Sequence, residues 1–249
     1  MLSDQQFTRY LRQVSLPEVG ESGQEKLLNQ TILVIGCGGL GSAASLYLAG
    51  AGIGKIVLAD GDKIELSNLP RQLTYTVEDV GKLKVDCLRQ RLTALNPEVA
   101  IRTVNKPLRD EQLSIEISLA DIVLDCTDNL KTRHAINSAC VAQRKDLVSG
   151  SAIGWSGQVI SFPFSNHINS GCYRCLYPFD ELPETQRCSD SGVMGPVVGM
   201  IGLNQSLEAI KLTLGIAQEN EAIKLFNGLM NSWQALSLAR EHQCTVCAN

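Results

Sequence analysis

The chain has 249 residues, which is enough for one large α/β domain or for a domain with an appendage. Its formal net charge is −4 at pH 7 and no basic cluster stands out, so the composition argues against a nucleic-acid partner. The first residues have no apolar signal core, and the longest apolar run, residues 193–216, contains Asn204, Glu208 and Lys211, so we expect a cytoplasmic protein without a membrane span.

Apolar periodicity and turn residues predict helices and strands that alternate over residues 1–150. A capping box at Ser3 predicts a first helix that runs to Leu16. Strands are then expected near 31–35, 55–60, 100–104, 121–125 and 146–150. The helices between them are expected near 39–51, 81–95, 110–119 and 129–142. This order is typical of an α/β fold with a Rossmann-like, mainly parallel sheet.

The rest of the chain is expected to continue this sheet and to contain one long loop. We expect a strand at 158–164, a helix at 194–214, and two short strands near 222–227 and 232–239. Residues 165–192 form a cysteine-bearing loop between the first of these strands and the helix. A loop of this length in a compact domain usually has a function or binds a metal.

A glycine-rich turn follows the strand expected at 31–35. Its residues are Gly36, Cys37, Gly38, Gly39, Leu40 and Gly41. Glycines at 36, 38 and 41 permit the tight strand-to-helix turn, the approach of backbone to phosphate and the close helix packing of a dinucleotide-type site. Asp60 ends the next strand, where a carboxylate accepts hydrogen bonds from ribose hydroxyls. These residues predict a nucleotide site without defining its chemistry.

Two cations follow Asp60. Arg71 lies in a polar loop and Lys84 lies just beyond it. Helix N–H groups alone can bind much of a pyrophosphate, whereas two additional cations are better suited to a triphosphate because they offset charge on the leaving group. The pair therefore favours ATP over a nicotinamide dinucleotide.

Asp128 and Asn129 follow the buried strand expected at 121–125. Ligands of open α/β sheets bind at the carboxyl ends of the strands, so Asp128 is a candidate to hold Mg²⁺ on the phosphates. The alternative is that Asp128 and Asn129 cap the helix that follows. The residues alone leave both interpretations open.

Five motifs in one order along the chain resemble those of the ThiF/MoeB/HesA family, the bacterial relatives of ubiquitin-activating enzymes. They are Arg9-Tyr10-Leu11-Arg12-Gln13, Gly36-Cys37-Gly38-Gly39-Leu40-Gly41, Ser67-Asn68-Leu69-Pro70-Arg71-Gln72, Asp125-Cys126-Thr127-Asp128-Asn129 and Cys172-Tyr173-Arg174-Cys175-Leu176. Pro70 stands where many members have Gln. The resemblance implies a single domain over 1–249, with a nucleotide-binding half at about 1–150 and a carrier- and zinc-binding half at about 151–249.

The resemblance also implies a reaction: ATP-dependent adenylation of the C-terminal glycine of a ubiquitin-fold sulfur-carrier protein that ends in Gly-Gly, with release of pyrophosphate. A carboxylate is already ionised at neutral pH, so its attack on the α-phosphorus needs positioning and charge neutralisation rather than a general base. The residues implied to contact nucleotide or Mg²⁺ are Gly36, Gly38, Gly39, Gly41, Asp60, Ser67, Asn68, Arg71, Lys84, Asp128 and Asn129. Arg12 is implied to reach the phosphates of a neighbouring subunit, which makes the active unit a homodimer.

The cysteines indicate a metal rather than disulfides, because a reducing cytoplasm keeps thiols free. Cys172 and Cys175 form one C-x-x-C pair, and Cys244 and Cys247 form a second. Together they predict a four-thiolate zinc site, although two separate redox-active or inert pairs have the same spacing. The family pattern favours structural zinc, which leaves no open coordination position for catalysis.

Cys188 differs from the other cysteines because Arg187 precedes it in a polar stretch of the long loop. A neighbouring cation favours the reactive thiolate, while the alternative is an exposed cysteine without a role. The resemblance implies that Cys188 accepts the activated acyl group or receives sulfur as a persulfide, with a persulfide-donating sulfurtransferase as a further partner. We expect the remaining cysteines to be packing residues: Cys37, Cys87, Cys126 and Cys140.

The sequence leaves the carrier open between the ThiS type of thiamine synthesis and the MoaD type of molybdopterin synthesis. Details of segments 46–52, 75–79 and 195–199 favour the thiamine branch. An NAD-dependent oxidoreductase would have no use for Arg71, Lys84 and Asp128 together. A catalytically silent subunit of a heterodimer would lack some of these three residues, and all three are present.

Overall fold

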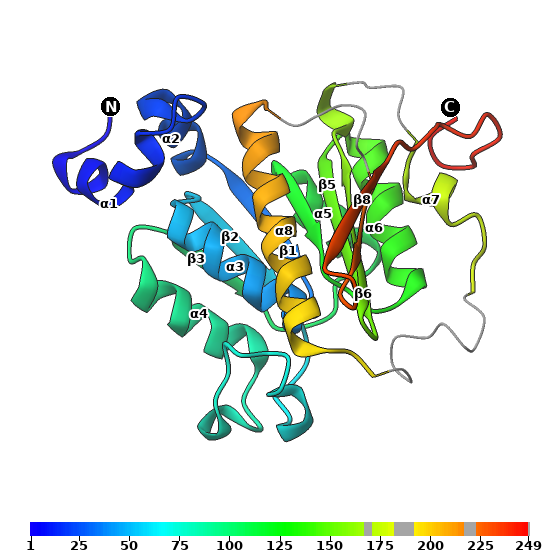
Figure 1. Ribbon diagram of the computed structural model, residues 1–249, viewed down its shortest axis with the longest axis horizontal. Helices are drawn as coiled ribbons and strands as arrows, with labels where there is room; N and C mark the ends of the chain where they lie inside the picture. Colours follow the sequence, from blue (N-terminus) through cyan, green and yellow to red (C-terminus); the bar gives the residue numbers. More distant parts are fainter. Residues whose placement is uncertain (167–170, 182–191, 217–222, 249) are drawn as a thin grey trace.

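A computed structural model describes residues 1–166, 171–181, 192–216 and 223–248. Within these residues eight strands form one sheet in the order β3-β2-β1-β4-β5-β6-β7-β8, with helices on both faces (Figure 1). This confirms the expected α/β fold. None of the helices in the described segments combines the length and the apolar character needed to cross a membrane.

The first five strands pair in parallel and form the Rossmann-like half. They are β1 (Thr31–Ile35), β2 (Lys55–Ala59), β3 (Ala100–Val104), β4 (Ile122–Asp125) and β5 (Asp146–Ile153). The crossover helices are α3 (Gly39–Ala51), α4 (Lys84–Leu95), α5 (Asp110–Ser118) and α6 (Leu130–Gln143). Strand order reverses between β1 and β4, so their carboxyl ends open a crevice, which is where ligands bind in such sheets.

The last three strands extend the sheet in antiparallel fashion. They are β6 (Ser156–Phe162), β7 (Ile223–Asn227) and β8 (Ser232–Leu236). The long helix α8 (Gly195–Leu214) packs across the middle of the sheet beside α3 (Figure 1). The expected elements are therefore present, with ends displaced by a few residues.

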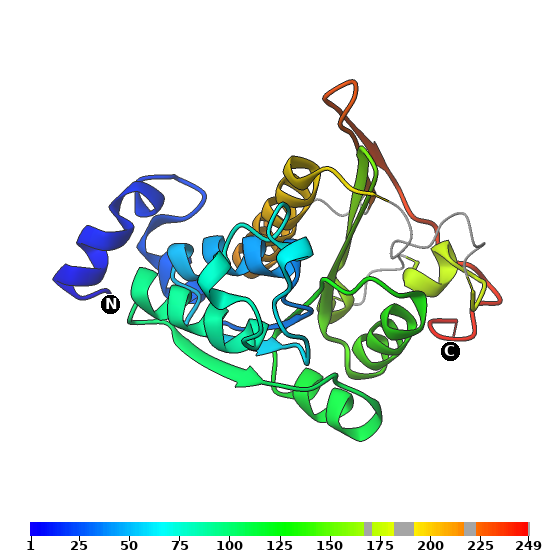
Figure 2. The same cartoon turned by 90° about the horizontal axis from the view of Figure 1, so that it is seen from below.

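Two apolar clusters, one on each face of the sheet, make up the core. Helices α3, α4 and α8 cover one face, and α5 and α6 cover the other (Figure 2). Alternate residues of β1 serve the two faces: Ile32 and Val34 pack on the first, and Leu33 and Ile35 on the second. Each fully buried aliphatic side chain of this kind contributes about 1.5–3 kcal/mol relative to an exposed one.

The N-terminal region contains a helix that the sequence did not reveal. The capping box at Ser3 is confirmed, and α1 (Asp4–Val14) ends two residues before the predicted Leu16. A second helix, α2 (Gly20–Leu28), follows without any side-chain cap. Its Gly23 lowers helix propensity and lies against α8, where a Cβ would lie 2.9 Å from Leu214 Cδ2 and that side chain would have to shift.

Helix α4 begins at Lys84, three residues later than predicted. Gly81 adopts φ +87°, and Lys63 and Leu83 form an isolated antiparallel bridge. The Ile64 N–H donates to the Lys82 carbonyl at 2.9 Å, and Leu83 is extended with φ −68° and ψ 133°, so the helix begins at Lys84. This short ladder fixes the position of Lys84 relative to the segment after β2.

Short helices occupy the connections. They are the 3-10 turns η1 (Leu66–Asn68), η2 (Val77–Asp79) and η3 (Phe164–Asn166), and the four-residue helix α7 (Tyr173–Leu176). The last two lie in the described part of the predicted long loop at 165–192. Cys188 lies outside the described residues.

Candidate active site

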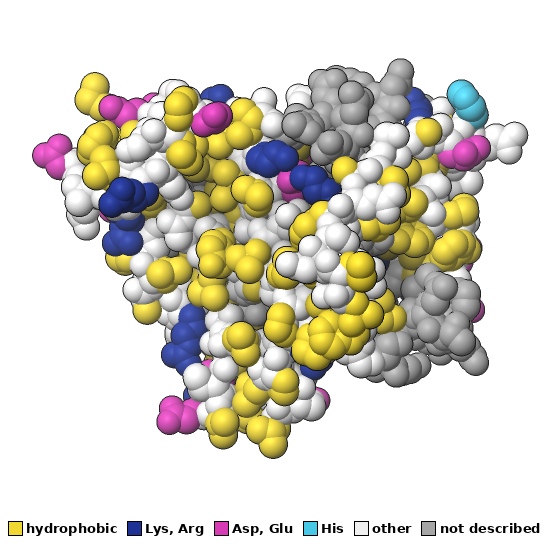
Figure 3. All heavy atoms as spheres, viewed as in Figure 1, with side chains coloured by type: hydrophobic (Ala, Val, Ile, Leu, Met, Phe, Trp, Pro, Cys, Tyr) yellow, Lys and Arg dark blue, Asp and Glu magenta, His cyan; other side chains and the backbone are white. Residues whose placement is uncertain are grey.

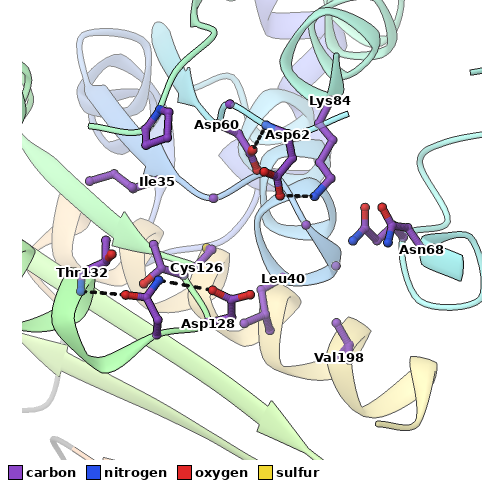
Figure 4. Close-up of a pocket in the computed structure, with 18 of the residues that line it drawn as sticks. Ile35, Leu40, Asp60, Asp62, Asn68, Lys84, Cys126, Asp128, Thr132 and Val198 are labelled. Carbon is purple, nitrogen blue, oxygen red and sulfur yellow. Dashed lines mark hydrogen bonds and ion pairs between the residues drawn. The ribbon is translucent and has the colours of Figure 1, made fainter. Parts of the chain in front are cut away.

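A cavity of about 760 Å³ lies at the carboxyl ends of β1, β2 and β4 (Figure 4). The glycine turn, the segments after β2 and β3 and the loop between β4 and α6 line it. Most of the predicted nucleotide residues are among its lining: Gly36, Gly38, Gly39, Asp60, Asn68, Arg71, Lys84, Asp128 and Asn129. Its size is ordinary for a small-molecule site.

The glycine turn presents the start of α3 to this cavity. Gly38 is the N-cap and offers no side-chain cap, so the first N–H groups of the helix are available to an anion. Gly39 is needed for close packing, because a Cβ there would lie 2.7 Å from the Arg71 carbonyl oxygen. Gly41 does not line the cavity, and its Cβ would lie 1.9 Å from the Gly36 oxygen. Gly41 therefore serves helix–strand packing.

Asp60 is held by backbone donors at the end of β2. Its Oδ2 accepts from the Cys37 N–H at 2.7 Å, and its Oδ1 accepts from the Asp62 N–H at 2.7 Å. Each carboxylate oxygen has a further acceptor site, so both remain able to accept from ribose hydroxyls. The two bonds also join the glycine turn to the segment after β2.

The two predicted cations are held in different ways. Lys84 Nζ forms an ion pair with Asp62 Oδ2 at 2.9 Å, and the Lys84 side chain is 8% exposed (Figure 4). An Arg71 guanidinium nitrogen donates to the Ser67 carbonyl at 3.0 Å. Ser67 does not line the cavity, so its visible role is to orient Arg71 through its backbone. Asn68 is buried, and its Oδ1 accepts from the Glu65 N–H at 3.2 Å.

Asn129, and not Asp128, caps α6. Asn129 Oδ1 accepts from the Thr132 N–H at 2.9 Å, and its Nδ2 donates to Asp128 Oδ1 at 3.4 Å. Asp128 is exposed and borders the cavity (Figure 4). The capping interpretation thus applies to Asn129 alone, and the Asp128 carboxylate is accessible for a metal on bound phosphates.

Sequence reasoning missed a buried charge network beneath Asp128. Asp125 is 1% exposed; its Oδ1 accepts from the Thr127 hydroxyl at 2.7 Å and its Oδ2 from the Ser149 hydroxyl at 2.8 Å. Arg133 lies 3.6 Å from Asp125 and donates to the Thr127 and Gly150 carbonyls. The loop that carries Asp128 is therefore fixed from both sides. Arg133 could have been recognised because it is a charged residue on the inner face of a predicted helix, which indicates a buried ion pair.

Two further parts of the lining were not predicted. Pro107, Leu108 and Arg109, between β3 and α5, form a wall of the cavity beyond Asp60. Gln72 is 3% exposed, and its Oε1 has no hydrogen-bond partner among the described residues. The loop of residues 107–109 carries no recognisable sequence motif, so its place at the cavity is seen only in the fold.

The four cysteines of the two C-x-x-C pairs come together at the C-terminal end of the molecule. Their sulfur atoms all lie within 4.8 Å of one another, with Cys172 to Cys244 at 3.7 Å and Cys175 to Cys247 at 3.5 Å. Tetrahedral Zn–S bonds of about 2.3 Å require sulfur atoms about 3.8 Å apart, so the cluster fits zinc. Asn137 Nδ2, on α6, contacts Cys172 Sγ at 3.5 Å.

The remaining described cysteines are packing residues, as predicted: Cys37, Cys87, Cys126 and Cys140 are all buried. Burial raises the pKa of the Cys126 thiol, which makes it a poor nucleophile although it borders the cavity. Arg12 is exposed on α1 and does not line the cavity of its own chain.

The geometry is that of an α/β protein with a nucleotide-type cavity and a four-cysteine cluster that fits zinc. The chain belongs to the ThiF family, whose model matches residues 10–246. It is 46% identical over 248 residues to the sulfur carrier protein ThiS adenylyltransferase of Escherichia coli (strain K12), covering 99% of this chain and 97% of that protein. It is 42% identical over 248 residues to the molybdopterin-synthase adenylyltransferase of the same organism, covering 99% and 98%.

The fold is also similar to that of a solved structure. A crystal structure of E. coli MccB with MccA-N7isoASN superimposes with a TM-score of 0.81 at 23% identity, covering 100% of this chain and 76% of that one. At this identity the likeness supports the fold alone. The predicted family and fold class are thus confirmed.

Proposed function

We propose that the protein is an ATP-dependent adenylyltransferase that activates the C-terminal glycine carboxylate of a ThiS-type, ubiquitin-fold sulfur carrier and releases pyrophosphate. The observation that carries the proposal is one cavity that combines an uncapped helix start, the cations Arg71 and Lys84, and the accessible carboxylate of Asp128. The extent of the match to the E. coli ThiS adenylyltransferase, nearly the full length of both chains, supports the carrier type.

The reaction brings an anion to a polyanion, so charge neutralisation is the main catalytic task. The N–H groups at the start of α3 bind phosphate oxygens, and Asp60 orients the ribose. Arg71 and Lys84 offset the charge that develops on the leaving pyrophosphate. No side chain needs to remove a proton, because the attacking carboxylate is ionised at neutral pH.

Asp128 is the residue proposed to hold Mg²⁺. Protein sites for Mg²⁺ often contribute only one or two carboxylates and leave the remaining positions to water and substrate phosphates, and a single accessible carboxylate at the cavity fits that pattern. When bound, the ion neutralises phosphate charge. The Asp125–Arg133 network keeps the Asp128 loop in place.

The cysteine cluster is proposed to bind one structural zinc through Cys172, Cys175, Cys244 and Cys247. Four thiolates complete a tetrahedral shell, so the metal stabilises the fold and leaves the chemistry to the cavity. The site joins α7 to the C-terminal segment.

A homodimer is proposed in which Arg12 of each subunit serves the other subunit's cavity. Exposed apolar side chains support an interface: Tyr47 on α3 is 58% exposed, Leu207 on α8 is 51% exposed and Leu73 is 84% exposed. Apolar side chains gather over α3 and α8 on the face seen in Figure 3. Patches of this kind on a folded protein indicate an interaction surface.

Three further predictions remain proposals. Cys188 is proposed to accept the acyl group or to receive sulfur from a persulfide-donating sulfurtransferase. A cytoplasmic location is also proposed. The division into a nucleotide-binding half and a carrier-binding half also stays a prediction.

Carrier-dependent ATP–pyrophosphate exchange tests the proposed reaction. The purified protein should exchange labelled pyrophosphate into ATP only when the intact ThiS-type carrier is present. The same carrier without its last glycine is the matched control and should give no exchange. Exchange at the same rate with and without the carrier would contradict the proposal.

The second candidate function is the same reaction on a MoaD-type carrier, which is supported by the 42% identity to the molybdopterin-synthase adenylyltransferase.

A further inference from the structure

Four acidic residues line the cavity, Asp60, Asp62, Glu65 and Asp128, and Asp62 is the one that forms an ion pair with Lys84. It lines the cavity, its side chain is 72% exposed, and its Oδ2 lies 2.9 Å from Lys84 Nζ (Figure 4). A carboxylate close to bound phosphates repels them, which weakens nucleotide binding. Asp62 lies beside Lys84, the cation expected to contact those phosphates, so we expect it to have a role that offsets this repulsion.

The backbone of Asp62 is fixed at both of its polar groups. Its N–H donates to Asp60 Oδ1 at 2.7 Å, and its carbonyl accepts from the Lys84 N–H at 3.0 Å. The neighbouring Lys63–Leu83 bridge continues this pairing. Asp62 is thus anchored to the predicted ribose-binding residue on one side and to the start of α4 on the other.

The Lys84 side chain depends on Asp62 for its orientation. Lys84 is 8% exposed, and among the described residues Asp62 is the acceptor that its ammonium contacts. An ammonium group has three donors, so two remain for phosphate oxygens while the third is held. A four-carbon side chain is flexible, and ordering it in advance lowers the cost of ordering it during reaction.

We propose that Asp62 is a positioning residue that holds the Lys84 ammonium in place for the transferring phosphates. The proposal rests on the proposed adenylation. Asp62 is expected to favour the transition state, because it orders Lys84. It is not expected to tighten the binding of ATP, because its carboxylate repels the ground-state triphosphate. Loss of the carboxylate should therefore separate turnover from affinity.

The test compares Asp62→Ala with Asp62→Asn, and uses Asp86→Ala as the matched control. The alanine keeps the backbone bonds to Asp60 and Lys84, and the asparagine keeps an oxygen that can accept from Nζ. Asp86 lies in the first turn of α4 but does not line the cavity. We expect Asp62→Ala to lower kcat for carrier-dependent exchange at least tenfold, with the KM for ATP unchanged or lower. Asp62→Asn should lose less, and Asp86→Ala should stay within twofold of the parent protein.

Several outcomes would overturn the proposal. A parental kcat in Asp62→Ala would do so, and so would a raised KM for ATP with unchanged kcat, which would make Asp62 a binding residue. Recovery of the variant at high Mg²⁺ would make Asp62 a metal ligand instead. Crystal structures of the parent and Asp62→Ala supply a readout that needs no carrier. Displacement of Lys84 Nζ from the cavity is expected, and an unmoved Nζ overturns the positioning role even if the parent proves to catalyse a different reaction.

Discussion

At the scale of single residues, Arg71 and Lys84 are the two cations on which the proposed chemistry depends. We expect Arg71→Ala or Lys84→Ala to lower carrier-dependent exchange 10²–10³-fold, which corresponds to about 2.7–4 kcal/mol of lost transition-state stabilisation. The free energy of unfolding should change by less than about 1 kcal/mol, since the Asp62 left unpaired by the second variant is 72% exposed.

Lys82→Ala is a suitable control for these two variants. Lys82 is 59% exposed and pairs with Asp79, outside the cavity lining. It should exchange pyrophosphate at the parental rate. Near-parental exchange in both Arg71→Ala and Lys84→Ala would rule out their phosphate roles.

Cys188 is the residue proposed for the step after adenylation. Cys188→Ala should keep pyrophosphate exchange near the parental rate and lose any covalent enzyme–carrier adduct that a reductant releases, as measured by non-reducing electrophoresis and mass spectrometry. An exchange defect as severe as that of Arg71→Ala would place Cys188 in the adenylation site. Cys126 is a poor substitute acceptor because it is 8% exposed and its thiol pKa is raised by burial.

At the scale of elements, the start of α3 determines whether the phosphate cradle can form. Gly41→Ala should lower the free energy of unfolding by about 1–3 kcal/mol, because the new Cβ would lie 1.9 Å from the Gly36 oxygen and force the helix away from β1. Gly50 lies on the same helix, and a Cβ there would meet no atom within 4 Å. Gly50→Ala should therefore be neutral or stabilising by up to about 1 kcal/mol.

Chemical denaturation of the two glycine variants, with ATP titration by calorimetry, checks this prediction. Gly41→Ala should also bind ATP more weakly, since the N–H groups of the first helical turn move with the helix. Equal stability of the two variants would contradict the packing role of Gly41.

The elements also show what could be predicted from the sequence. Apolar runs located the parallel strands, and Asp60 was recognised because it follows one of them directly. Lys84 was recognised as the second cation beyond the glycine turn, after Arg71. Helix α2 was missed because neither Val19 nor Gly20 gives an N-terminal signal and its position depends on packing against α8. The Asp125–Arg133 network was missed because its partners come together only after β4, α6 and β5 have formed.

At the scale of the whole molecule, α6 connects the cavity to the cysteine cluster. Asn129 caps the end of α6 beside Asp128, and two turns later Asn137 contacts Cys172. A metal at the cluster would therefore stabilise the C-terminal segment and α7 against a helix that also borders the nucleotide site. The spacing of the cysteines predicted two C-x-x-C pairs. That the pairs form one site depends on the fold, which brings cysteines 72 positions apart in the sequence into contact.

Metal analysis should find one zinc per chain. Cys247→Ser, or removal of the metal by a chelator, should lower the melting temperature and raise amide hydrogen exchange in residues 171–181 and 240–248. The protein that remains folded should still catalyse ATP–pyrophosphate exchange. A metal-free protein with parental stability would contradict the structural zinc. Complete loss of exchange in protein that remains folded would give the metal a role in the chemistry.

Adenylation of a ThiS-type carrier in the cavity can be tested directly. The most direct measurement is kcat/KM for ATP–pyrophosphate exchange with purified ThiS-type and MoaD-type carriers from the same organism, each compared with its variant that lacks the terminal glycine. We expect kcat/KM to be at least tenfold higher with the intact ThiS-type carrier than with the intact MoaD-type carrier, and we expect no exchange with either truncated form. Preference for the MoaD type would reassign the substrate, and no exchange with either intact carrier would contradict the proposed adenylation.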